Sequence, residues 1–74
     1  MHNKLQTLKS KLEKIDGVDV EQEDAVSICV SVGQTYTVFM EDGQLVYQEE
    51  YNGIRNPVEV EPFIEFMEKE VEMA

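Results

Sequence analysis

Residues 18–53 read VDVEQEDAVSICVSVGQTYTVFMEDGQLVYQEEYNG, and the pattern of this segment indicates the class of fold. Apolar and polar side chains alternate through most of it, which is the two-residue period of a β-strand. Three pairs that favour tight turns punctuate the alternation: Gly33-Gln34, Asp42-Gly43 and Asn52-Gly53. The stretch therefore predicts three strands joined by hairpins, which makes the sheet antiparallel.

The first of these strands is the least regular. The alternation covers residues 18–32, which is long for one strand, and it fails at Gln22 and Asp24. A bend or turn is therefore expected there, which leaves residues 25–32 as the first strand. Residues 35–40 and 44–51 form the second and third strands.

The N-terminal flank has the spacing of an amphipathic helix. Between Asn3 and Asp16 apolar residues recur every three or four positions, and lysines occupy the other side. Asn3 is suited to cap the start of this helix, and Gly17 to end it in a left-handed conformation. The apolar residues of this helix are Leu5, Leu8, Leu12 and Ile15.

The C-terminal flank predicts a second amphipathic helix. Prolines 57 and 62 exclude a regular helix through residues 54–61, which are predicted to be a loop, and Pro62 fits the first helical position. The helix carries an apolar stripe of Phe63, Ile64, Phe66, Met67 and Val71. Residues 1–74 are therefore predicted to form one α+β domain of order α-β-β-β-α. In this domain the N-terminal and C-terminal helices flank a three-stranded antiparallel sheet and pack on one of its faces.

Charge is distributed unevenly along the chain. Sixteen acidic and six basic residues give a formal net charge of −10. Four lysines fall in the first fourteen residues, so the rest carries fifteen carboxylates against Arg55 and Lys69, which gives −13. A surface of this sign repels nucleic acids and anionic membranes and attracts basic proteins. We therefore expect a basic protein as the partner, and we read the lysines as a solvated helix face, with a nucleic-acid patch as the alternative.

No set of residues predicts catalysis, a cofactor or a metal site. Counted as a calcium loop, the acidic segment from Asp19 has Asp24 where glycine is needed and Val30 where a bidentate glutamate is needed. Cys29 has no basic neighbour in sequence to activate its thiolate, and His2 lies at the chain terminus. The lone cysteine forms no intramolecular disulfide, and no signal segment or long apolar run is present. These features predict a non-enzymatic protein of the cytoplasm.

The predicted partner-binding residues are carboxylates and one aromatic side chain. Carboxylates that alternate on an extended segment recur about every 6.6 Å, and duplex DNA likewise presents regularly spaced negative charge. Phe39 is predicted to lie on the sheet face away from the helices, in a small apolar patch with Cys29 and Val46. The alternatives are that the loop of residues 54–61 covers Phe39, or that the chain self-associates through this face or a sheet edge. The predicted set is Asp19, Glu21, Glu23, Asp24, Phe39, Glu49 and Glu50.

The short length, the acidity and the order of helix, three hairpin-linked strands and helix resemble the small phage-encoded anti-defence proteins. These include anti-CRISPR inhibitors that act as nucleic-acid mimics. The layout covers residues 3–71, and its lysine-rich first helix departs from a uniformly acidic mimic. The resemblance implies an inhibitor or decoy that occupies the basic site of a nucleic-acid-binding protein in the host cytoplasm. The alternative is a small protein-interaction or homodimerisation module whose acidity serves only solubility.

Overall fold

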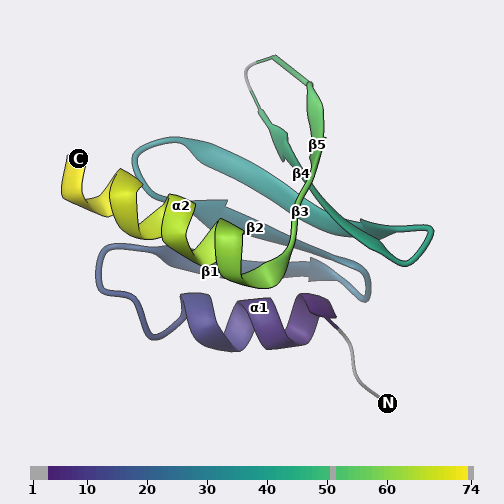
Figure 1. The fold of residues 1–74 in the computed structure, drawn as a ribbon, viewed down its shortest axis with the longest axis horizontal. Helices are drawn as coiled ribbons and strands as arrows, with labels where there is room; N and C mark the ends of the chain where they lie inside the picture. Colours follow the sequence, from purple (N-terminus) through teal and green to yellow (C-terminus); the bar gives the residue numbers. More distant parts are fainter. Residues whose placement is uncertain (1–3, 51, 74) are drawn as a thin grey trace.

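A computed structural model describes residues 4–50 and 52–73, which form two helices and five strands (Figure 1). The sheet is a meander in which each strand pairs antiparallel with the next, in the order β1-β2-β3-β4-β5. The elements are α1 (Lys4–Leu12), β1 (Asp19–Asp24), β2 (Ser27–Ser31), β3 (Thr35–Glu41), β4 (Gln44–Glu49), β5 (Arg55–Pro57) and α2 (Val60–Met73).

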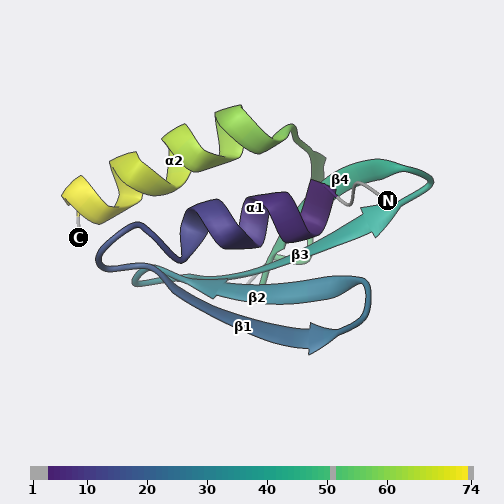
Figure 2. The same ribbon diagram turned by 90° about the horizontal axis from the view of Figure 1, so that it is seen from below.

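Both helices lie on the same side of the sheet, and its other face is left uncovered by them (Figure 2). The α+β class, the antiparallel sheet and its two flanking helices are therefore confirmed. The predicted number of strands is wrong, because the sheet has five strands and not three.

The alternating segment of residues 18–32 contains two strands with a turn between them, and the second of these, β2, corresponds to the predicted first strand of residues 25–32. Asp24 accepts a hydrogen bond from the backbone N–H of Val26 at 2.9 Å, and the register of β1 against β2 shifts between Gln22 and Asp24. A bulge thus lies where the sequence predicts a bend, the turn itself follows at residues 25–26, and the acidic residues before the turn form β1. They do so because β2 supplies a ladder of backbone partners, which outweighs low β-propensity. Val26 consequently lies in the turn with 57% of its surface exposed.

The predicted loop of residues 54–61 contains the fifth strand. β5 pairs with β4, with Pro57 opposite Val46 and Arg55 opposite Gln48. A proline is tolerated here because β5 is an edge strand, where the missing N–H faces away from the neighbouring strand. The third predicted strand ends correspondingly earlier, at Glu49, and residue 51 lies outside the described residues.

The helix boundaries also differ from the predicted ones. α2 begins at Val60, two residues before Pro62, and Pro62 is accommodated because N–H groups of the first turn have no intrahelical acceptor. α1 ends at Leu12, after which the chain continues in tighter turns to Gly17, whose φ is +94° as predicted. A Cβ at Gly17 would also lie 3.3 Å from a methyl carbon of Val71. The expected cap, Asn3, lies outside the described residues.

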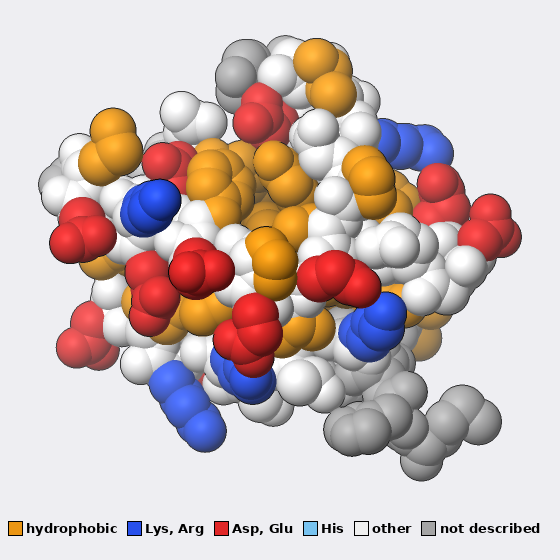
Figure 3. Space-filling model, in the orientation of Figure 1, with side chains coloured by type: hydrophobic (Ala, Val, Ile, Leu, Met, Phe, Trp, Pro, Cys, Tyr) orange, Lys and Arg blue, Asp and Glu red, His pale blue; other side chains and the backbone are white. Residues whose placement is uncertain are grey.

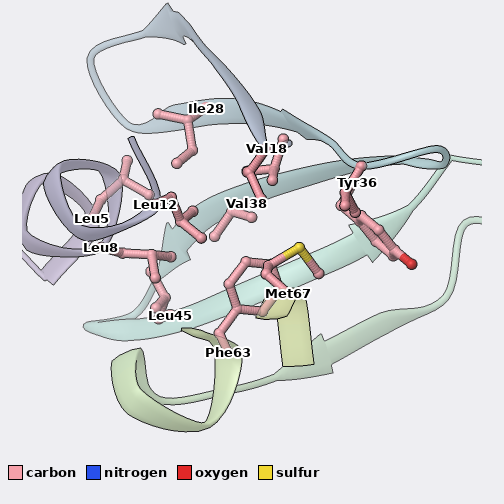
Figure 4. Close-up of a cluster of buried hydrophobic side chains, with 12 residues drawn as sticks. Leu5, Leu8, Leu12, Val18, Ile28, Tyr36, Val38, Leu45, Phe63 and Met67 are labelled. Atoms are coloured by element: carbon pink, nitrogen blue, oxygen red, sulfur yellow. The ribbon is translucent and has the colours of Figure 1, made fainter. Parts of the chain in front are cut away.

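The buried core fills the space between the helices and the sheet (Figure 4). Side chains of α1 and α2 meet alternate residues of β2, β3 and β4, as strand periodicity requires. The ring centroids of Tyr47 and Phe63 lie 5.3 Å apart, and those of Tyr36 and Phe66 lie 5.7 Å apart. The core residues are Leu5, Leu8, Leu12, Val18, Ile28, Val30, Val32, Tyr36, Val38, Leu45, Phe63 and Met67.

Candidate partner-binding surface

The sheet face turned away from the helices, called the open face below, is built by strand alternation. Residues paired across neighbouring strands share a face, so the partners of outward residues are also outward. Phe39 of β3 lies opposite Ser27 on one side and Val46 on the other, and it points away from the helices, as predicted. The open face comprises Asp19, Glu21, Ser27, Cys29, Ser31, Thr35, Thr37, Phe39, Glu41, Gln44, Val46, Gln48, Arg55 and Pro57.

Four carboxylates lie on or beside this face, three on β1 and one just after β4, on the other side of β2 and β3; we call them the acidic border, and they are Asp19, Glu21, Glu23 and Glu50. Glu21 lies directly opposite Cys29 across the β1–β2 ladder, and Asp19 lies opposite Ser31 of β2. Burial raises the pKa of the Cys29 thiol, and the negative charges of Glu23, Glu21 and Glu50 raise it further. Negative charge from β1, from its bulge and from the residue that follows β4 therefore acts on the same thiol.

The floor beside the acidic border is made of small polar side chains. Ser27, Cys29 and Ser31 of β2 and Thr35 and Thr37 of β3 present hydroxyl and thiol groups, all partly exposed. A shallow depression of about 320 Å³ lies over this floor, lined by Asp19, Val20, Glu21, Cys29 and Ser31. It is open to solvent, so this surface is suited to meeting another macromolecule and not to enclosing a small molecule.

The basic side chains that form ion pairs lie away from the acidic border. Lys4 and Lys11 of α1 form ion pairs with Glu59 and Glu61 on the helix side, where acidic and basic side chains intermix (Figure 3). Within residues 4–50 and 52–73, no basic side chain lies within 4.0 Å of an acidic-border carboxylate. In the same ranges, no three His, Cys, Asp or Glu side chains are grouped so as to hold a metal ion. The border thus carries negative charge that the described chain does not neutralise.

Two carboxylates of the predicted set do not belong to this border. Asp24 is the last residue of β1, opposite Ser27, and its carboxylate accepts the hydrogen bond from the backbone N–H of Val26 in the turn that follows, which lowers the pKa of its carboxyl group. Glu49 lies on the helix side of β4 and accepts a hydrogen bond from the Asn52 amide at 2.6 Å. Asp24 therefore supports the turn, and Glu49 faces in the opposite direction from Glu50.

Phe39 lies in an apolar row with Val46 and Pro57, and Cys29 belongs to the neighbouring row. The guanidinium of Arg55 lies over the Phe39 ring, 5.7 Å from its centroid, and donates a hydrogen bond to Glu41 at 2.8 Å. Residues of the expected loop therefore cover part of Phe39. The sequence did not indicate Arg55 or Pro57 as part of this face, because the three-residue strand that carries them is too short to have a readable period.

A comparison with protein-family models gives no match, and comparisons with curated proteins and with solved structures give none either. Neither α1 nor α2, the two helices found in the described ranges, is long and apolar enough to cross a membrane. The open face and its charge are therefore the basis for the functional argument.

Proposed function

We propose that this protein is a non-enzymatic inhibitor or decoy that binds a basic, nucleic-acid-processing protein through its open face. The single observation that carries the proposal is the acidic border, whose carboxylates come from different segments and have no basic partner among the described residues. Carboxylates held in this way favour the arginines and lysines of a partner. The target class is the one that the sequence resemblance implies, namely a bacterial defence protein that reads nucleic acid in the cytoplasm.

The geometry of the border supports competition with nucleic acid. Asp19 and Glu21 lie on the same face of a strand, at positions two residues apart, and Glu50 adds negative charge from the turn after β4. A basic groove that normally binds phosphates presents several cations at once, so a rigid set of carboxylates can meet more than one of them. Because the sheet holds the border in place, little conformational entropy is lost when the partner binds.

The proposal is tested by reversing the charge of the border in a lysate pull-down washed across a salt series. In the variant Glu21→Lys/Glu23→Lys we expect recovery of the captured basic protein to fall by about tenfold or more, because attraction becomes repulsion. Capture by the unaltered protein should weaken as salt rises. The captured protein is identified by mass spectrometry, and competition with its nucleic acid is then measured directly.

The matched control is Glu65→Lys/Glu68→Lys, which changes the same number of charges on exposed positions of α2. This control should bind as the unaltered protein does, and both variants should remain folded by circular dichroism. Capture that is equal at low and high salt, or equal loss in the two variants, contradicts a specific role of the border.

A second candidate function is a homodimerisation or protein-interaction module, and the apolar row on the open face favours it. Phe39 is only partly covered by Arg55, and Val46 and Pro57 continue the row to the edge of the sheet. Val46 itself is buried, with 5% of its surface exposed, so Phe39 and Pro57 supply the accessible apolar surface of the row, and such surface is typical of protein interfaces. Sedimentation over a range of protein concentrations distinguishes the two functions, because only the second requires a stable dimer.

A further inference from the structure

The two edges of the sheet differ in how they are protected against further strand pairing. β5 is three residues long and contains Pro57, and both features are typical of edges that do not accept another strand. β1 is six residues long and contains no proline, its bulge after Gln22 leaves residues 19–22 as a regular edge, and no described residue pairs with the outer side of that edge. β1 is therefore the sheet edge that can accept another strand.

The direction of the β1 backbone groups follows from the ladder. The N–H of Met40 donates to the carbonyl of Val26, so even-numbered residues of β2 point their backbone groups at β3 and odd-numbered ones at β1. Glu21, which is opposite an odd-numbered residue, accordingly points its groups at β2. The N–H and C=O groups of Val20 and Gln22 point outward, away from the sheet.

The side chains of β1 select what can pair with this edge. Asp19 and Glu21 are two residues apart on the open face, whereas Val20 between them packs against the core on the helix side. A strand added beside β1 would place alternate side chains next to the two carboxylates, and the side chains between them next to Val20. Like charges placed directly opposite each other are destabilising, so this edge disfavours a second copy of itself and favours a basic strand.

We propose that the partner contributes an extended segment with lysine or arginine at alternate positions, which adds to the sheet as a strand beside β1. This inference rests on the proposed function, since it specifies how the basic protein is held. Main-chain hydrogen bonds to Val20 and Gln22 provide affinity, and the pairing of basic side chains with Asp19 and Glu21 provides specificity. The residues between the basic positions are small or apolar, to fit beside Val20.

The experiment uses the full chain and two synthetic peptides of equal composition, TKTKVKTKT, in which lysines alternate, and KKKKTTVTT, in which they are grouped. Binding is measured by calorimetry, and protection of individual amides by hydrogen exchange followed by NMR. The alternating peptide should bind about tenfold more tightly than the grouped one. It should also slow exchange at the amides of Val20 and Gln22.

The backbone N–H that Val20→Pro removes points outward, but the variant also loses the valine side chain, which packs against the core. Val20→Ala is its control, because it loses the same side chain and keeps the N–H. Val20→Pro should weaken binding of the alternating peptide by about tenfold relative to Val20→Ala, the loss expected for one hydrogen bond and a blocked edge. Hydrogen exchange on the unaltered protein gives an answer that does not depend on the folding of the proline variant.

Two outcomes separate this inference from the proposed function. Equal, salt-sensitive binding of both peptides, without protection of Val20 and Gln22, overturns strand addition and leaves an electrostatic role of the acidic border intact. Binding of neither peptide, together with failure of the Glu21→Lys/Glu23→Lys variant to affect capture from a lysate, overturns both.

Discussion

Alternate residues of each strand lie on opposite faces of the sheet, and the two faces differ in the side chains that they carry. The helix side buries Tyr36 and Val38 of β3 under two helices, and lysines of α1 there pair with glutamates of the α2 region. The open face presents small hydroxyl side chains, one aromatic ring and four carboxylates without a basic partner among the described residues. The comparison indicates that stability resides on the first face and that the second is available for binding.

The largest expected effect is the loss of a core aromatic side chain. Phe63 is fully buried, so Phe63→Ala should lower the free energy of unfolding by about 3–5 kcal/mol, a large part of the stability of a domain this small. Phe39→Ala removes the same atoms from the open face, where the ring is partly exposed, and should cost about 1–2 kcal/mol. Urea unfolding followed by circular dichroism measures both, and equal losses would contradict the division between the faces.

A second prediction separates binding through apolar contact from binding through charge. If the chain dimerises through the open face, Phe39→Asp should abolish the dimer, because it places a charge in the apolar row beside Val46. The inhibitor function instead predicts a monomer at every concentration, with capture of the basic partner reduced less than by Glu21→Lys/Glu23→Lys. Analytical ultracentrifugation gives the mass, and a dimer that survives Phe39→Asp would rule out the apolar row as its interface.

The smallest effect concerns the reactivity of Cys29. Burial and then the charges of Glu23, Glu21 and Glu50 raise the pKa of its thiol, so less reactive thiolate is present at any given pH. Alkylation by iodoacetamide at pH 8 should therefore be slower than for a free cysteine. Glu21→Gln/Glu23→Gln should lower the pKa and speed the reaction, whereas Glu65→Gln/Glu68→Gln should not. Identical rates in the two variants would show that the border does not act on Cys29.

The middle of the fold follows from sequence, because its signals are local. The Asp42-Gly43 hairpin has positive φ at both residues, +51° and +77°, as the two-residue turn requires. The alternation in β2, β3 and β4 correctly divides inward from outward residues, including Phe39. The stripe around Phe63 and Met67 likewise identifies the core face of α2.

The two edge strands of the sheet, β1 and β5, are harder to predict from the sequence. The segment that becomes β1 is almost entirely acidic, and the segment that becomes β5 has only three residues, so neither has the composition or length of a typical strand. Each forms because a neighbouring strand offers backbone partners. Charge alone places Asp24 and Glu49 among the predicted binding residues. Charge indicates neither that Asp24 accepts a local hydrogen bond nor that Glu49 lies on the helix side of the sheet.

Four features can be read from the amino-acid sequence: the α+β class, the hairpins of the central strands, the inward and outward residues of those strands, and an acidic excess after the first helix. These depend on periodicity, turn chemistry and composition, which act over a few residues. Three features required the folded chain: the five strands of the sheet, the negative charge that Glu21, Glu23 and Glu50 add near Cys29, and the open edge at β1. Those features depend on which strands pair and in what register, and pairing joins residues that are distant in the chain.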